Sequence, residues 1–480
     1  MALEAVLVVF GYLVLNLVVG LWAAARQQGG VEEYFLAGRR LSPLVLFFTM
    51  VATNFSAFFF LGFAGAGYRI GLSYYAMMAL GTALVGSTFL FVGYPAWRLG
   101  RRLGAVTPAE LVGIRMQNTA LRVLCAVVWL LFTVPYIAIQ PIGAGYLLSQ
   151  LTDNAVPYYV GAVLLSALVV GYVFLGGMRS VAWTDVLQGL LMMGVSFAAL
   201  WFVAARWGGI EQANTLLLSR NPSLFSAQGA GGFFTLPVWI SYSLLWFLSV
   251  PMFPQMFVRF LAARNLEGLR LTAVLYPIVT AFLFLAPVLI GLWGHLELPQ
   301  LGERESDQVL PMLLGKVAPE WFAALVGVGA LAAFMSTMDS QLLVLSSLLT
   351  RDIYAVLRPQ ASWREQAWVG RILVVILAIA GLAIAWAPPA TLFAIATHAF
   401  SGLAALFPAV VCSLYARRPY PRSCIAAVLA GEGLLAGFYT GLVQPEWFGG
   451  FLPVVPVVGI ASAVLFVGMV VERRHVEQTA

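Results

Sequence analysis

Long runs of apolar residues, each bounded by charged or turn-forming residues, recur along the whole 480-residue chain. A run of about 18 to 28 such residues can cross the hydrocarbon core of a bilayer as a helix. Composition agrees, because 61% of the residues are hydrophobic and 10% are charged, against about 25% charged in a soluble domain. The sequence therefore predicts an all-α polytopic membrane protein. We place thirteen spans near residues 3–25, 43–68, 74–97, 120–148, 158–175, 186–205, 236–260, 271–293, 320–349, 367–387, 390–415, 424–442 and 453–471.

Basic residues divide unevenly between the two sides of this predicted bundle. With the N terminus outside, 21 of the 26 basic residues fall in the inward loops, Arg259 at the end of the seventh span among them. The outward segments keep only Arg69, Arg206, Arg220, Arg304 and Lys316. The positive-inside rule therefore predicts a plasma-membrane protein with an outside N terminus and a cytoplasmic C terminus. The net charge of +6 reflects this arginine belt and does not indicate nucleic-acid binding.

Polar residues interrupt the second predicted span. Thr53, Asn54 and Ser56 lie near its middle, where lipid offers no partner to a freed backbone group. In one interpretation these side chains bond to a neighbouring helix. In the other, the helix is discontinuous and its freed carbonyls bind a cation near the membrane centre. The second interpretation requires a partner segment.

The ninth span offers such a partner, because Ser336 and Thr337 are adjacent hydroxyls followed closely by Asp339. Sodium is a hard cation that prefers oxygen ligands, and neutral oxygens hold it without preventing its release. The alternative is that both hydroxyls bond back to carbonyls of the preceding helical turn.

Two further clusters lie in other spans. Gly176 and Gly177 predict a tight turn before the sixth span, and Asp185 is expected in the first turn of that span, where it complements the helix dipole. Pro251 and Pro254 predict an interruption of the seventh span.

Together these clusters resemble the sodium/solute symporter family over nearly the whole chain. The resemblance is carried, in the family's order, by residues 34–39, 54–57, 176–177 with 183–188, 254–264, and 335–347 followed by 351–354. It implies one transporter domain whose core consists of two inverted five-helix repeats, residues 43–205 and 236–415, each starting with a broken helix. Residues 3–25 and 424–471 are then peripheral helices, and 472–480 form a cytoplasmic tail.

The same resemblance implies a sodium site. Its ligands are expected to be the carbonyls of Ala52, Phe55 and Ala333 and the hydroxyls of Ser336 and Thr337. Sodium is the expected coupling ion, and no organic cofactor is expected.

The solute site is implied beside the sodium, between the broken helices and the fourth and eleventh spans. Its expected residues are Asn54, Ser56, Phe59, Tyr136, Trp246 and Pro254. Asn54 replaces an Asp of the proline-type branch, and Phe59 stands where the sugar-type branch has a polar amide, which argues against a sugar. No basic residue is expected at the membrane centre. We therefore expect a small organic anion or zwitterion such as proline, pantothenate or a short monocarboxylate.

Arg39, Asp185 and Asp339 are the expected gating or coupling residues, whereas Glu432 has no assigned role and His398 faces either the solute or a neighbouring helix. Two alternatives stay open. A proton carried by Asp185 or Asp339 could replace sodium, or the chain could be a solute sensor, although no signalling domain is expected after Val470. An enzyme is not expected, because the sequence has neither a phosphate-binding glycine loop nor a metal cluster. The sequence does not predict the oligomeric state.

Overall fold

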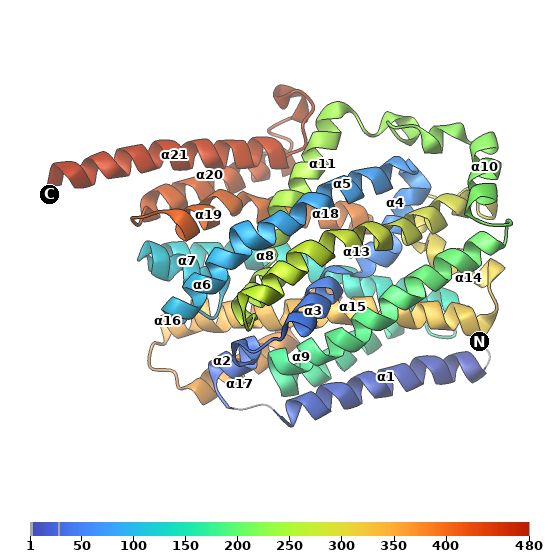
Figure 1. Ribbon diagram of the computed structural model, residues 1–480, viewed down its shortest axis with the longest axis horizontal. Coiled ribbons are helices and arrows are strands. Elements are labelled where there is room, and N and C mark those ends of the chain that lie inside the picture. Colours follow the sequence, from blue (N-terminus) through green and yellow to red (C-terminus); the bar gives the residue numbers. More distant parts are fainter. Residues whose placement is uncertain (1–2, 27–28, 480) are drawn as a thin grey trace.

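The computed structural model describes residues 3–26 and 29–479, and its elements in this part of the chain are helices (Figure 1). The α-helices are α1 (Leu3–Ala24), α2 (Val31–Leu36), α3 (Pro43–Asn54), α4 (Phe63–Ile70), α5 (Ser73–Thr88), α6 (Tyr94–Leu103), α7 (Pro108–Met116), α8 (Thr119–Leu151), α9 (Tyr158–Ala205), α10 (Ile210–Arg220), α11 (Leu236–Ser249), α12 (Pro254–Ala262), α13 (Leu266–Trp293), α14 (Val309–Val317), α15 (Glu320–Leu348), α16 (Ala355–Leu357), α17 (Trp363–Ala385), α18 (Leu392–Ala405), α19 (Phe407–Tyr415), α20 (Pro421–Tyr439) and α21 (Val454–Thr479). The predicted all-α class is confirmed.

Each of the predicted spans falls on a helix or on a pair of helices. Among the described residues, eight helices are long and apolar enough to cross a membrane, and ten if each bent pair counts as one span. Two predicted spans, 158–175 and 186–205, lie within the 48 residues of α9. The total of thirteen spans remains a prediction.

Both predicted helix breaks are present. The axis bends by 56° between α3 and the segment Phe58–Ile70, and by 49° between Leu236–Met252 and α12. At the first break the backbone of Phe55 is extended, and at the second Pro254 starts the new helix after Phe253. These two bent pairs bring irregular backbone into the interior of the bundle, where protein can supply its hydrogen-bond partners.

Helix α15 passes through the middle of the bundle, and α21 lies at its edge (Figure 1). In an 18-residue apolar stretch of the span that contains α15, 89% of the residues are buried. In the corresponding stretch of α21, 28% of the residues are buried. Helix α1 starts at one end of the bundle, whereas α21 ends at the other (Figure 1).

The predicted turn at Gly177 lies inside α9. Gly177 has φ 52° and ψ −149°, so the helix is interrupted there. An L-residue rarely adopts this backbone conformation. A Cβ at this position would also meet the carbonyl oxygen and the ring of Tyr34. Glycine is therefore required at this turn.

We expect Gly177→Ala to lower the free energy of unfolding by about 1 to 3 kcal/mol, because the alanine must hold a strained backbone conformation. The measurement is the thermal unfolding midpoint of the detergent-purified protein. Gly171→Ala, in the same helix, is the matched control, because a Cβ there meets no atom within 4 Å. A similar loss in both variants would contradict the role assigned to Gly177.

Candidate functional site

Backbone carbonyls freed by the first break face α15. Ser336 Oγ lies 2.9 Å from the carbonyl oxygen of Ala52 and 2.9 Å from that of Ala333. The hydroxyl thus bonds back within its own helix and also reaches across to a carbonyl of α3.

Thr337 makes a second connection between the same two helices. Its Oγ1 lies 3.0 Å from the carbonyl oxygen of Phe55 and 3.2 Å from that of Thr53. The structure therefore brings the five predicted oxygens together in two groups, one around each hydroxyl, and adds the Thr53 carbonyl to them. All of these residues are buried.

The amide side of the break is held by α8. Gln140 Oε1 accepts a hydrogen bond of 3.0 Å from the backbone N–H of Ala57, and Ser56 Oγ accepts one of 3.1 Å from Phe58. The hydroxyls of Ser56 and Tyr136 lie 3.2 Å apart. The sequence analysis missed Gln140, although an amide four residues after Tyr136 in an apolar span was a usable signal.

Aromatic rings gather beside the two breaks, and we call the following five residues the aromatic cluster: Phe58, Tyr136, Trp246, Phe253 and Phe400. The ring of Phe400 lies 4.9 Å from Tyr136 and 5.1 Å from Trp246 between centroids. Phe253 lies 4.6 Å from Phe400, and Phe58 lies 5.9 Å from Trp246. Tyr136 and Trp246 were both predicted to line the solute site, and the structure places them in contact with one common ring.

Three other predicted solute residues, Phe59, Asn54 and Pro254, lie outside this cluster. Phe59 points toward α13, with its ring 5.9 Å from Phe284, whereas the neighbouring Phe58 belongs to the aromatic cluster. Asn54 donates a hydrogen bond to the hydroxyl of Tyr276 on α13. Pro254 starts α12 directly after the clustered Phe253.

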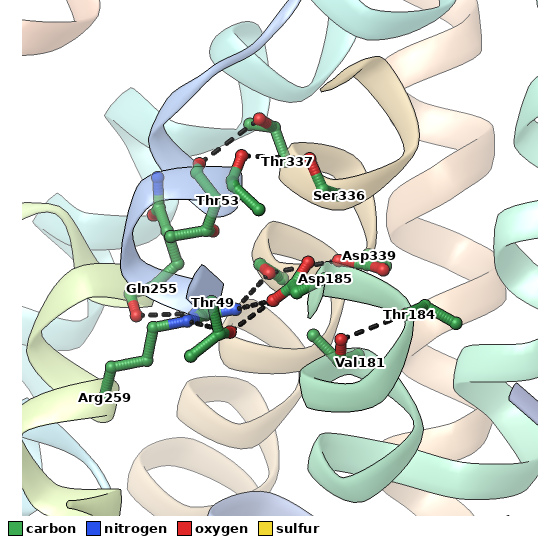
Figure 2. Close-up of polar contacts among 12 residues, drawn as sticks. Thr49, Thr53, Val181, Thr184, Asp185, Gln255, Arg259, Ser336, Thr337 and Asp339 are labelled. Carbon is green, nitrogen blue, oxygen red and sulfur yellow. Dashed lines mark hydrogen bonds and ion pairs between the residues drawn. The ribbon is translucent and has the colours of Figure 1, made fainter. Parts of the chain in front are cut away.

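A charged pair lies fully buried among α3, α9, α12 and α15. Arg259 Nη2 lies 2.8 Å from Asp185 Oδ2 and 2.5 Å from Ser340 Oγ (Figure 2). Arg259 Nε also donates to Thr49 Oγ1 over 2.8 Å. The sequence analysis counted Arg259 with the inward loops, and this placement is wrong because its side chain is fully buried inside the bundle.

Asp185 also differs from its expected position. It lies eight residues beyond the interruption at Gly177, so it pairs with Arg259 instead of complementing a first helical turn. Asp339 lies close by: Tyr172 donates to its Oδ2 over 2.8 Å, and Ser340 donates to its Oδ1 over 3.0 Å. Two carboxyl groups therefore share this interior region with one guanidinium.

Arg39 lies at the end of the bundle that carries the loop between α6 and α7. It pairs with Glu32 and donates to the carbonyl oxygens of Ala105, over 2.7 Å, and Leu261, over 3.4 Å. The side chain thus ties α2 to two other segments at this end. Its gating role remains a prediction.

His398 and Glu432 lie away from the aromatic cluster. Both line a groove of about 940 Å³ between α8, α18 and α20. The ring of His398 packs against Tyr439 at 4.8 Å, so this histidine faces a neighbouring helix.

At the opposite end from Arg39, Asp307 connects α4 to α18. Its Oδ1 lies 3.3 Å from Arg69 Nη1 on α4. Its Oδ2 accepts a hydrogen bond of 2.8 Å from the backbone N–H of Leu392 at the start of α18. Burial raises the pKa of Asp307 to about 6, although the neighbouring Arg69 acts in the opposite direction.

Two solved transporters share this fold. A Na⁺-coupled sialic acid symporter aligns with a TM-score of 0.79 and 19% identity, over 97% of this chain and 98% of its own. A nucleobase-cation-symport-1 family transporter aligns with a TM-score of 0.64 and 14% identity, over 93% of this chain and 95% of its own.

Curated relatives also span almost the full length. The sodium/pantothenate symporter of Escherichia coli is 29% identical and is matched over 98% of this chain and 96% of its own. The osmoregulated proline transporter of Bacillus subtilis is 28% identical and is matched over 92% of this chain and 90% of its own. The model of the sodium:solute symporter family matches residues 34–431, and the chain therefore belongs to this family of membrane transporters.

Proposed function

We propose that this protein uses a sodium gradient to import a small organic anion or zwitterion by alternating access. The observation that carries the proposal is the meeting of the carbonyls at the first helix break with the hydroxyls of Ser336 and Thr337. The names of the related symporters support the same function.

The residues at this break fit a sodium ion. Their ligand atoms are neutral oxygens, which suit a hard cation that must also be released. Each hydroxyl can turn its proton away and offer a lone pair, because hydroxyl groups rotate. The carbonyl oxygen of Thr53, 3.2 Å from Thr337 Oγ1, is a further neutral oxygen next to the predicted ligands. With sodium bound, these oxygens would hold a positive charge beside the solute.

The aromatic cluster supports a solute with an apolar body. Ser56, Tyr136 and Asn54 supply the polar groups next to the sodium site. The sodium charge would meet a solute carboxylate, as in transporters with broken helices. Relatives named for pantothenate and proline carry solutes with a carboxylate, which fits this arrangement.

Two charged connections at different depths support alternating access. Arg259 with Asp185 joins α12 to α9, and Arg69 with Asp307 joins α4 to the loop before α14. We place the first on the cytoplasmic side of the solute and the second on the outer side, following the orientation that the arginine distribution predicts. Opening one while the other stays closed would expose the site to one side at a time.

The test of the proposed function is uptake into proteoliposomes. We expect one or more members of a panel of amino acids, short carboxylates, pantothenate and sugars to accumulate only with an inward sodium gradient. Uptake that does not depend on the sodium gradient but requires a proton gradient would contradict sodium coupling.

Ser336→Ala and Thr337→Ala should each weaken sodium binding by about 5- to 150-fold, because losing one ligand costs roughly 1 to 3 kcal/mol. Thr337→Ser should keep most of the affinity. The sodium concentration for half-maximal uptake is the measurement, and the solute constant should also rise at low sodium because the two bindings are coupled. Ser346→Ala is the control, since that hydroxyl bonds back to Leu343 in the same helix.

Normal transport by both alanine variants at limiting sodium would remove this site from the mechanism. Proton coupling through Asp339 would then be the better explanation. The observation that favours this second candidate is the presence of two buried carboxyl groups beside one guanidinium.

Asp185→Asn should lower the free energy of unfolding by about 3 to 5 kcal/mol, because it removes the carboxylate that forms the buried ion pair with Arg259. Uptake should slow while solute binding from outside persists. Asp185→Asn combined with Arg259→Gln should recover part of the lost stability, as measured by thermal unfolding. Glu32→Gln is the control, since Glu32 is 53% exposed and its pair with Arg39 should contribute less than about 1 kcal/mol. Additive effects in the double variant would show that the pair is not coupled.

The pKa of about 6 at Asp307 predicts a pH effect on access from outside. If opening of the outer side exposes Asp307 and returns its pKa to the ordinary 3.8, the outward-closed form of the protein binds the proton more tightly than the outward-open form. Lowering the outside pH from 7 to 5 should then favour the closed form by about tenfold, and this advantage is lost as the pH rises through 6. Arg69 and Glu303 are the charged neighbours that share this environment.

The measurement is the initial uptake rate at low solute concentration against outside pH. Asp307→Asn should remove the dependence between pH 5 and 7, because an amide does not titrate. Glu305→Gln, in the same loop, should leave it unchanged. A pH profile that survives in Asp307→Asn would assign the effect to another group.

A further inference from the structure

One face of α8 runs past both helix breaks. Trp129 Nε1 donates over 2.7 Å to the carbonyl oxygen of Met252 at the second break, and Gln140 accepts from Ala57 at the first. Thr133 and Tyr136 lie between these two contacts in the sequence. At 3.6 residues per turn, the four α8 side chains fall within an arc of roughly 60°. Thr133 therefore lies on the face that connects the two breaks.

The hydroxyl of Thr133 has no hydrogen-bond partner among the described residues, although its side chain is fully buried. Threonines in membrane helices usually bond back to their own helix, as Thr88 and Thr184 do here. A buried hydroxyl without a partner is unfavourable. This position therefore holds a polar group that the protein itself does not use.

Ser249 repeats this arrangement on α11, next to the second break. It is the last residue of α11, three residues after Trp246, and its hydroxyl is fully buried without a partner in the described part of the chain. Thr133 likewise lies three residues before Tyr136. Because α8 runs away from the arginine-rich end and α11 runs toward it, both hydroxyls lie one turn from the aromatic cluster on the same side.

We infer that Thr133 and Ser249 bind a second polar group of the solute, a hydroxyl or an amide, at the end away from its carboxylate. Thr133 lies about 10 Å along α8 from Gln140, which marks the first break. The matching substrate class is an extended monocarboxylate with a polar group several bonds from the carboxylate. This inference rests on the sodium-coupled uptake proposed above. The two hydroxyls are buried in this conformation, so the aromatic rings must separate before a solute reaches them.

The test compares two competitors that differ by one hydroxyl, hexanoate and 6-hydroxyhexanoate. Each competitor is added to the proteoliposome assay while sodium-dependent uptake of the best substrate from that panel is measured. With the unmodified protein, 6-hydroxyhexanoate should inhibit about tenfold more strongly than hexanoate, because the site offers partners that hexanoate leaves unpaired. In Thr133→Val and in Ser249→Ala, this ratio should fall to about threefold or less, mainly through weaker inhibition by 6-hydroxyhexanoate.

Thr133→Ser keeps the hydroxyl and should keep the ratio, which separates lost binding from lost folding. Thr88→Val and Ser166→Ala are the matched controls, because their hydroxyls bond back within their own helices, and they should leave the ratio unchanged. Sodium binding in the absence of solute should stay the same in all five variants. Equal inhibition by the two competitors in the unmodified protein, no inhibition by either, or an unchanged ratio in Thr133→Val would overturn the inference. Absence of sodium-dependent uptake in the unmodified protein would instead overturn the proposed function.

Discussion

The backbone between Asn54 and Phe58 must find hydrogen-bond partners without water, and the surrounding architecture supplies them. Helix α8 provides Gln140 for an amide of the break, and α15 provides two hydroxyls for its carbonyls. These partners come from helices that are far apart in sequence. The break is thus held open only when the bundle is assembled around it, and the polar centre of the protein depends on that assembly.

Local sequence was sufficient for the helices and their interruptions. The helical class followed from apolar length, and the breaks near Ser56 and Pro254 followed from polar residues and proline inside apolar runs. The adjacent hydroxyls of Ser336 and Thr337 could also be connected to the first break, because freed carbonyls and neutral hydroxyls suit the same ion. These features depend on residues that are close together in the chain.

Other features depend on how helices are rotated against each other, which periodicity does not determine. Phe58 and Phe59 are neighbours of identical chemistry, and only the packing shows that Phe58 joins the aromatic cluster. Arg259 looked like a loop residue because it ends an apolar run, but α12 continues inside the bundle. Its pairing with Asp185 joins positions 74 residues apart. Thr133 gave no signal at all, since a lone threonine in a span is ordinary.

The contrast in burial between α15 and α21 determines where the bilayer can act on this protein. Helix α15 carries Ser336 and Thr337, the proposed sodium ligands, and is shielded by other helices. A change in lipid thickness or headgroup therefore reaches it only through its neighbours. Helices at the edge of the bundle, such as α21, contact the lipid directly and adapt to its thickness by tilting. Membrane composition should therefore alter the speed at which the bundle rearranges much more than the intrinsic affinity of its centre for an ion.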